Sequence, residues 1–578
     1  MNLVRQWRYV LLAMLAIAAL GVMAACGDDD NAGTNTPAAS GSPTPSTGPT
    51  DMAPDAQQVY TLNGRAEPTS IDPQAQSYTY EALVTNATYL PLFDQDPETS
   101  QLTPLAAVEV PTTANGGVSA DGLTYTIKLK PDLKWSDGSQ VTAADFVYGI
   151  IRGYNLTISG GGYGGFITTI KGAPEALALD SKSATYVADI QNLLKDSVVA
   201  VDATTLKLVA NKVSVAFPSN FVLPITAAVK QSNVETLGDS FGQAAGAAQM
   251  VTNGPFKIKQ WIAKDHLTLT RYEDYTAGHK AYLREVNVYF LEDGVQAYNA
   301  LLAGDYDEAE VPPANYAAVK DDPTVHQEQE FGTRWITVDV TIPPWNNKDF
   351  VIAMNQATDR ATISRDVYFG LRQPWTSPCA AAVYGCDPTI FKNLDFDLTK
   401  AKASALKAYP DGVIPGIIID GANDATTQNL IQTIKSQWEQ VPGVHVELKT
   451  VDQATIRSDM KGHISGTQIT GWGMDFADPT DIWSTLLKEA IGGNNLGFYD
   501  RPGYDTLEKQ QDTQTDSTAR KATLKKLQEF LAADPAHITF AVKLRTAQFN
   551  PKIKGIVTSP FDYEVIGDQF LEDIYVGQ

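Results

Sequence analysis

The segment that decides the fold runs from residue 413 to residue 472. Its pieces are VIPGIIID (413–420), ATTQNLIQTIKSQWE (425–439), VHVELKT (444–450), QATIRSDMK (453–461) and TQITGW (467–472). The first, third and fifth pieces are typical of strands, and the apolar residues of the second recur at helical spacing. The fourth piece also favours a helix. Strands that alternate with helices in this way predict a parallel sheet with helices on its faces.

Outside this segment, the sequence patterns no longer alternate regularly between strand and helix. Residues 124–130 alternate apolar and polar side chains, as a half-buried strand does. Thr142 and Asp145 have the spacing of a capping box, and Asp516 precedes a long amphipathic helix that reaches Ala533. The remaining predicted strands cover residues 204–210, 256–261, 266–272, 285–290 and 538–544. The early part is rich in antiparallel patterns and the middle part is doubly wound, so we expect at least two lobes.

Composition and charge exclude several classes of protein. The 578 residues include 44 Lys and Arg against 67 Asp and Glu, a net charge of -23. Such a surface repels phosphate backbones, so nucleic acid is not an expected partner. Three cysteines without a CxxC pair, and six histidines without metal-site spacing, give no support to a metal or another cofactor.

The N-terminus predicts the compartment. Residues 1–9 carry two arginines and no acid, and residues 10–23 form an apolar run that is too short to span a membrane. Met23 and two alanines stand directly before Cys26, which resembles a bacterial lipobox. We therefore expect a signal peptide over residues 1–25, a lipidated Cys26 that carries acyl chains such as palmitate, and a flexible linker to residue 57. An ordinary signal peptide or an uncleaved anchor is the alternative.

The other two cysteines are expected to form a disulfide. Cys379 and Cys386 remain as an even pair in an oxidising compartment, with six residues between them. A short closed loop of this kind is stiffened locally. A redox or metal pair is the alternative, but it would usually show CxxC spacing and a nearby histidine.

Several segments in order resemble the family 5 extracellular solute-binding proteins of bacterial ABC importers, which include oligopeptide- and dipeptide-binding lipoproteins. They are residues 67–73 (EPTSIDP), 121–148 (with DGSQVTAADFVY), 253–261 (NGPFKIKQW), 271–280 (RYEDYTAGHK) and 297–309 (with LLAGDYD). The resemblance implies an α/β, bilobal periplasmic-binding-protein-like clamp with a hinge. Its parts would be lobe I over residues 58–312, with a subdomain near 93–204, lobe II over 313–544, and a return to lobe I over 545–578.

The segment ITGWGMDFADP (469–479) is the predicted ligand site. A strand that ends in Gly-Trp-Gly places Asp475 on a loop that faces the crevice, the usual ligand position in open α/β sheets. By resemblance, Asp475 would hold the α-ammonium group of a peptide. Helix capping is the alternative role for Asp475 and Asp478, and ordinary core packing is the alternative for Trp472. The resemblance further implies ligand contacts from Gly471, Gly473, Trp472, Ser77, Tyr78, Thr79 and Tyr80, and leaves Arg334, Lys348 and Arg372 as candidates for the ligand carboxylate.

The implied function is that of a monomeric, non-enzymatic lipoprotein on the extracytoplasmic face of the cell membrane. It would capture peptides and deliver them to an ABC permease and its ATPase. A non-peptide solute, such as an oligosaccharide or a nickel chelate, is the alternative on the same fold. Two further hypotheses remain: a hydrolase that uses Asp475 and Asp478 as a carboxylate pair, and a binding protein for signalling or adhesion.

Overall fold

The computed structural model describes residues 49–76, 79–97, 99–159, 167–491, 493–560, 566–567 and 570–578. The chain divides into two compact units, Met1–Thr50 and Asp51–Gln578, and almost all described residues belong to the second. The predicted signal peptide and Cys26 lie outside the described residues.

The second unit begins earlier than the sequence suggests. The linker is predicted to run to residue 57, but residues 51–57 already belong to the unit. Ala53 is buried, and its N–H donates to the carbonyl of Val576 at 2.8 Å. Gln58 donates from its side chain to the same two residues' carbonyls. Contacts with the distant C-terminus, which local composition does not reveal, therefore fix the start of the unit.

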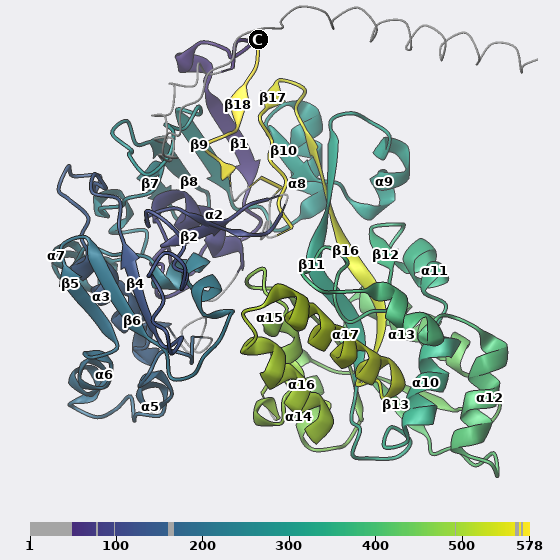
Figure 1. Ribbon diagram of the computed structural model, residues 1–578. Coiled ribbons are helices and arrows are strands. Elements are labelled where there is room, and N and C mark those ends of the chain that lie inside the picture. Colours follow the sequence, from purple (N-terminus) through teal and green to yellow (C-terminus); the bar gives the residue numbers. More distant parts are fainter. Residues whose placement is uncertain are drawn as a thin grey trace, which may run out of the picture. The chain divides into compact units, whose positions relative to one another are not determined.

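One large sheet of eleven strands organises this unit (Figure 1). The sheet contains parallel pairs at one end, antiparallel pairs in the middle and both kinds at the other end. Its strands, in order, are β14 (Val446–Thr450), β13 (Ile417–Gly421), β15 (Thr467–Gly473), β11 (Val325–Val338), β16 (His537–Phe549), β10 (Glu308–Glu310), β1 (Val59–Asn63), β9 (Glu285–Tyr289), β8 (His266–Arg271) and β7 (Phe256–Ile262), with β12 (Arg372–Pro374) paired to β16.

The predicted alternation of strands and helices is present in this sheet. β13 pairs in parallel with β14 and, at Asp420 and Gln468, with β15. The connecting helices are α13 (Ala425–Trp438) and α14 (Gln453–Lys461). β13 begins at Ile417 rather than at residue 413. Pro415, which lacks an N–H group, stands two residues before this start.

Side-chain caps begin the helices where the sequence predicts them. Asp145 accepts hydrogen bonds from the N–H and the hydroxyl of Thr142, both at 2.8 Å, before α3 (Ala143–Gly153). Asp516 accepts from the N–H of Ala519 at 2.7 Å at the start of α17 (Ser517–Ala533). Each cap satisfies a backbone donor that has no partner within the helix.

β11 and β16 are the two long strands that connect the halves of the sheet. Residues 325–329 of β11 pair with the end of β16 beside β10, whereas residues 332–338 also pair with β15. The β11–β16 register shifts between Gln329 and Thr333 and again between Arg334 and Trp335. Such irregularities bend and twist a strand locally. Figure 1 shows the two strands side by side.

Two large hydrophobic cores lie on either side of these irregularities. One contains Tyr60, Trp135 and Phe217 and includes Phe549 and further residues from the C-terminal segment. The other contains residues between Trp335 and Ala541. The chain therefore leaves the first core, builds the second and returns to the first.

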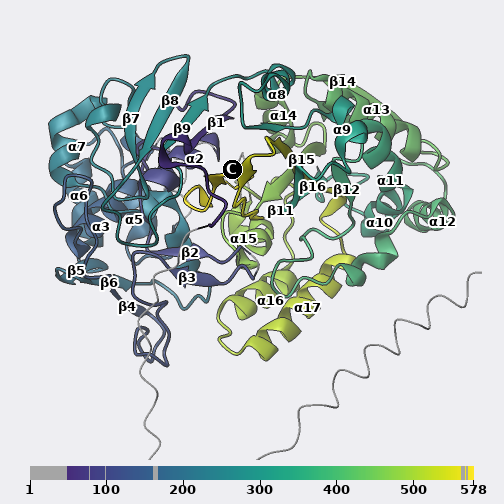
Figure 2. The same ribbon diagram turned by 90° about the horizontal axis from the view of Figure 1, so that it is seen from above.

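Smaller sheets and helices surround the large sheet. Figure 2 shows α16 and α17 side by side. The remaining strands are β2 (Phe93–Gln95) with β3 (Leu102–Pro104), β4 (Thr124–Lys128) with β6 (Thr205–Val209) and β5 (Val198–Asp202), and β17 (Ile553–Lys554) with β18 (Tyr575–Val576). The remaining helices are α2 (Thr79–Thr88), α4 (Leu156–Ser159), α5 (Ala173–Leu177), α6 (Tyr186–Leu194), α7 (Gln231–Leu237), α8 (Gly294–Ala303), α9 (Pro313–Val319), α10 (Lys348–Ala357), α11 (Arg360–Thr362), α12 (Leu398–Ala408), α15 (Thr480–Trp483) and α16 (Pro502–Asp512).

A disulfide joins Cys379 to Cys386. Gln528 on α17 holds the closed loop from outside: its side chain donates to the carbonyl of Gly385 and accepts from the N–H of Asp387, both at 2.8 Å. The loop is therefore tied to α17 as well as to itself.

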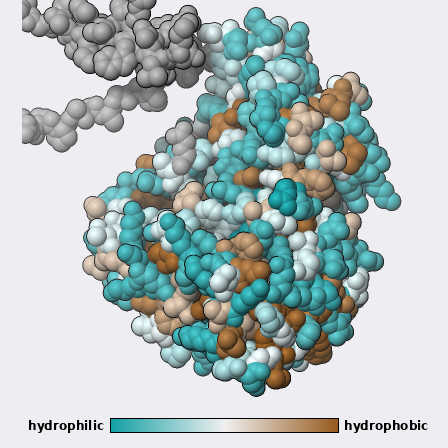
Figure 3. Space-filling view, turned by 90° about the vertical axis from the view of Figure 1, so that its right-hand side faces the viewer, coloured by the Kyte–Doolittle hydropathy of each residue, from teal (hydrophilic) through white to brown (hydrophobic). Residues whose placement is uncertain are grey.

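The part of the chain that the structure describes contains no helix long and apolar enough to cross a membrane. On the face drawn in Figure 3, hydrophobic residues occur in small groups among hydrophilic ones.

Candidate functional site

β15 carries the predicted ligand segment, and much of one edge of this strand is open. β11 covers the other edge from Thr467 to Gly473. β13 meets the open edge only at Gln468, and among the described residues no strand pairs there with residues 469–473. An unpaired strand edge offers N–H and C=O groups to an extended chain, which can add as a further strand.

The two glycines of β15 have different surroundings. A Cβ at Gly471 would lie 2.3 Å from the carbonyl oxygen of Thr333 and 2.7 Å from the Cδ of Arg334. Close packing on β11 therefore requires glycine at position 471. A Cβ at Gly473 would meet nothing within 4 Å. Only Gly473 thus stands beside open space, where a ligand backbone has room to approach.

Trp472 lies between these glycines and points to the other face of the strand. It is half-buried, packs against two of the hydrophobic clusters, and donates from Nε1 to Asp481 at 3.3 Å. Core packing therefore accounts for much of its environment, and its role as a pocket wall remains a prediction.

Asp475 follows β15, and its backbone binds the carboxylate of a second acid, Asp481, which sequence reasoning did not identify. The N–H of Asp475 donates to the Asp481 carboxylate at 2.7 Å. Burial raises the pKa of Asp475 to about 7. Burial, and then the charge of Asp475, raise the pKa of Asp481 well above its usual range. The sequence marks Asp481 only as an acid in the first turn of a short helix, which does not predict a position beside Asp475.

The Asp475 carboxyl lacks a compensating cation. The cause of its raised pKa is burial alone, and no cation among the described residues lies within ion-pair distance of it. A carboxylate in such surroundings is stabilised when a positive group enters beside it.

Asp478 has a different role from Asp475. Its two oxygens accept from Arg520 on α17 at 2.7 Å each, and the two side chains are only 10% and 9% exposed. Asp478 also accepts from the N–H of Thr480, the first residue of α15, at 2.9 Å, so it satisfies a backbone donor at the start of this helix. Because its charge is already paired, the structure does not support the hypothesis of a catalytic Asp475–Asp478 pair.

The predicted contacts from the first lobe are only partly described. Ser77 and Tyr78 lie outside the described residues. Thr79 and Tyr80 begin α2, and Tyr80 is half-buried. The ligand roles of these four residues therefore remain predictions.

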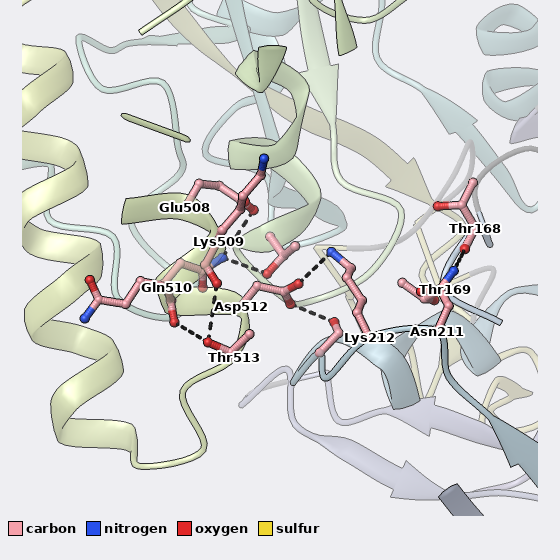
Figure 4. Close-up of polar contacts among 12 residues, drawn as sticks. Thr168, Thr169, Asn211, Lys212, Glu508, Lys509, Gln510, Asp512 and Thr513 are labelled. Atoms are coloured by element: carbon pink, nitrogen blue, oxygen red, sulfur yellow. Dashed lines mark hydrogen bonds and ion pairs between the residues drawn. The ribbon is translucent and has the colours of Figure 1, made fainter. Parts of the chain in front are cut away.

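A polar contact joins the end of α16 to residues 212–215, which belong to the part of the chain that builds the first hydrophobic core (Figure 4). Asp512 accepts from Lys212 at 3.1 Å and from the Ser214 hydroxyl at 2.7 Å, and its carbonyl accepts from the N–H of Val215 at 2.8 Å. One turn earlier in α16, burial and then the charge of Asp512 raise the pKa of Glu508 to about 8. Asp512 and Glu508 thus form a buried acidic cluster, and the exposed Lys212 lies at its edge.

Two cores linked by two long strands, with an uncompensated carboxyl at an open strand edge, define a bilobal α/β binding protein. The chain belongs to the bacterial extracellular solute-binding proteins, family 5: residues 107–494 match the description "Bacterial extracellular solute-binding proteins, family 5 Middle".

Curated relatives and solved structures agree with this assignment. The oligopeptide-binding protein OppA of Bacillus subtilis is 27% identical over 431 residues, 71% of this chain and 74% of that protein. The probable deoxycholate-binding periplasmic protein YgiS of Escherichia coli is 25% identical over 481 residues, 82% and 85% of the two chains. The murein tripeptide binding protein MppA of Escherichia coli has the same fold, with a TM-score of 0.71, 21% identity and coverage of 92% and 100%. Haemophilus influenzae OppA in complex with RPPGFSPFR gives a TM-score of 0.69, 20% identity and coverage of 91% and 100%.

Proposed function

We propose that this chain is the substrate-binding lipoprotein of an ABC importer, and that it captures peptides between its two lobes and delivers them to a membrane permease. In this proposal the chain acts as a monomer, catalyses no reaction and works with a permease and an ATPase subunit. The relatives named for oligopeptide and murein tripeptide binding support this choice of solute.

The observation that carries the proposal is the Asp475 carboxyl at the end of the open edge of β15. An ammonium group supplies the missing cation, and a peptide backbone supplies the missing strand. A free peptide N-terminus provides both groups in the correct order. Because an unpaired buried charge is costly, the site favours ligands with an ammonium group over those without one.

The domain boundaries and the anchor belong to the same proposal. Residues 1–25 act as signal peptide, Cys26 carries the lipid on the extracytoplasmic face, and the linker ends near the start of the compact unit at Asp51. Lobe I comprises residues 58–312 and 545–578, and lobe II comprises residues 313–544. Mass spectrometry of the membrane-extracted protein tests the anchor, since Cys26→Ser should lack the acyl mass.

A non-peptide solute is the second candidate, because relatives are named for deoxycholate and heme binding. Neither name specifies an ammonium group, which is the feature that Asp475 favours. The two candidates therefore differ in their dependence on this carboxyl.

Mass spectrometry of the small molecules released by denaturing the purified protein tests the proposal. We expect short peptides from the wild type and their loss from Asp475→Ala. Asp500→Ala is the matched control, because Asp500 lies outside the ligand segment and pairs with the exposed Lys488. A bile acid, a heme, a sugar or a metal chelate in place of peptides would refute the peptide assignment. An unchanged peptide load in Asp475→Ala would refute the role of Asp475 alone.

A further inference from the structure

Two acidic side chains line one small cavity in the part of the chain that builds the first hydrophobic core. The cavity has a volume of about 40 Å³ and is lined by Asp94 on β2 and by Glu572 near the C-terminus. Asn86 on α2 and Tyr275 also line it, and the other lining residues are leucine, valine and proline. Carboxyls from opposite ends of the described chain therefore meet at one largely apolar space.

Neither carboxyl has a cationic partner of its own. Asp94 accepts one hydrogen bond among the described residues, from the N–H of Gln95 at 2.7 Å. Burial raises the pKa of Asp94 to about 6. Burial also raises the pKa of Glu572 to about 7, and the charges of Asp573 and Asp94 add to this effect. The cation that acts on Glu572, His279, is already bound to Asp573 at 2.7 Å. Two uncompensated charges thus face the cavity when both carboxyls are ionised.

Tyr275 gives an independent indication that the cavity takes a ligand. Its side chain is only 9% exposed, and its hydroxyl makes no hydrogen bond to any described residue. Burial, and then the charges of Glu572 and Asp94, raise the pKa of Tyr275 well above its usual range, so the hydroxyl points toward the two carboxyls across the cavity. A buried hydroxyl without a partner is costly, and a ligand in the cavity relieves that cost.

The donor atoms around the cavity select a hard cation. The two carboxyls, the phenol of Tyr275 and the amide of Asn86 all offer oxygen, and the described lining contains no cysteine or histidine. Calcium and magnesium prefer oxygen ligands, whereas softer metals prefer sulfur and nitrogen. Two carboxylates also balance the charge of one divalent ion. The volume of the cavity is sufficient for an ion together with water.

We infer that Asp94 and Glu572 form a binding site for a hard divalent cation, calcium or magnesium, which Tyr275, Asn86 and water complete. This inference does not depend on the peptide proposal. In the described part of the chain, no three acidic, histidine or cysteine side chains come together as a metal site, so neutral oxygens must fill the remaining positions. We therefore expect a modest affinity, with a Kd of about 0.1–1 mM, as in extracellular calcium modules.

The sequence could not predict this site, because cysteine and histidine spacing is silent about oxygen donors that lie far apart in the chain. Calcium is the expected occupant, since it tolerates irregular geometry, whereas magnesium demands a nearly ideal octahedron. A bound ion would tie the C-terminal segment that contains Glu572 to β2 and α2.

Thermal unfolding of the full chain, purified in mild detergent and freed of metal with a chelator, tests the inference. We expect about 10 mM calcium to raise the Tm by about 1–3 °C, the shift that the expected Kd gives for a folded unit of this size. Sodium chloride of equal ionic strength should not reproduce this rise. Calorimetric titration with calcium should show a single class of site. An equal response to magnesium would assign the site to either ion, and a weaker one would assign it to calcium; both outcomes support the site.

The variants separate this site from general attraction of cations to a chain with a net charge of -23. Asp94→Asn and Glu572→Gln should each lose the calcium response. In metal-free buffer both should unfold at or above the wild-type Tm, because each removes an uncompensated buried carboxyl, so a lost response is not a lost fold. Glu109→Gln is the matched control and should keep the response, because Glu109 is exposed and lies outside the cavity lining. An equal rise of the Tm in the wild type and both cavity variants overturns the site, as does a wild type that binds neither calcium nor magnesium.

Discussion

Replacement of Arg520 by methionine should destabilise the second core more than most single substitutions would. The Arg520 side chain makes two hydrogen bonds of 2.7 Å to Asp478 and two to Gln511, at 3.0 and 2.8 Å. Both members of the ion pair are at least 90% buried. Without Arg520, the Asp478 carboxylate stays buried without its cation, which typically costs about 3–5 kcal/mol. We expect a loss of this size in the free energy of unfolding, measured by urea titration.

Two further variants decide whether the buried charge is the cause. Lys521 is the next residue on α17, is exposed, and also lies over the Tyr384 ring, at 5.1 Å against 5.5 Å for Arg520. Lys521→Met should therefore cost less than about 1 kcal/mol. Asp478→Asn combined with Arg520→Met should recover much of the loss, because no charge is then left unpaired. A loss below 1 kcal/mol in Arg520→Met, or no recovery in the double variant, would refute the reasoning.

Four other measurements follow from the described contacts. Because the pKa of Asp475 is about 7, peptide affinity should fall by up to about tenfold per pH unit below 7, and Asp475→Asn should bind weakly and lose this pH dependence in titrations. Without ligand, the raised pKa means that the folded chain holds more protons between about pH 4 and 7, so stability should fall as pH rises through that window, and less so in Asp475→Asn. Replacing both disulfide cysteines by serine should lower the free energy of unfolding by about 2–3 kcal/mol, as expected for a short closed loop; an unchanged urea midpoint would contradict this. Ser214→Ala should cost about 1–3 kcal/mol, because its acceptor Asp512 is buried, and Lys212→Met should also lower the free energy of unfolding, because it leaves the buried Asp512 carboxylate without its cation; an unchanged urea midpoint in both variants would be inconsistent with the contact.

Local signals in the sequence were sufficient for the doubly wound part of the fold. Helices such as α13 and α17 follow from apolar spacing and from an aspartate directly before the first turn. β13, β14 and β15 follow from short apolar or alternating runs between those helices. These signals lie within a few residues of the elements that they predict, so they do not depend on the rest of the chain.

β11 could not be predicted in the same way. Its first half is only partly buried and reads VHQEQE, which is mostly polar, whereas its second half is buried on both faces apart from the exposed Arg334. The two register shifts also interrupt the alternation that marks a strand. Its partner β16 lies some two hundred residues further along the chain, so the pairing has no local signal.

The site shows the same division between local and distant information. The strand that ends in Gly-Trp-Gly predicted the position of Asp475, but not the second carboxyl of Asp481 beside it. The resemblance explained both glycines by ligand approach, whereas the requirement for Gly471 comes from the carbonyl of Thr333 on β11. Arg520, which neutralises Asp478, lies 42 residues away on another helix.

The position of Asp475 therefore depends on residues outside the predicted ligand contacts. Asp478 holds the loop after Asp475 to Arg520 on α17, and Gln511 on α16 accepts from the same guanidinium. The next residue of α16, Asp512, bonds to the segment that contains Ser214. Hydrogen bonds thus join the loop of the candidate site to α17 and α16, and the backbone of α16 connects them to the contact between Asp512 and Ser214. We therefore expect a substitution in α16 or α17 that shifts these hydrogen bonds to move Asp475 as well, and to alter the proposed peptide binding although the substituted residue lies outside the predicted ligand segment.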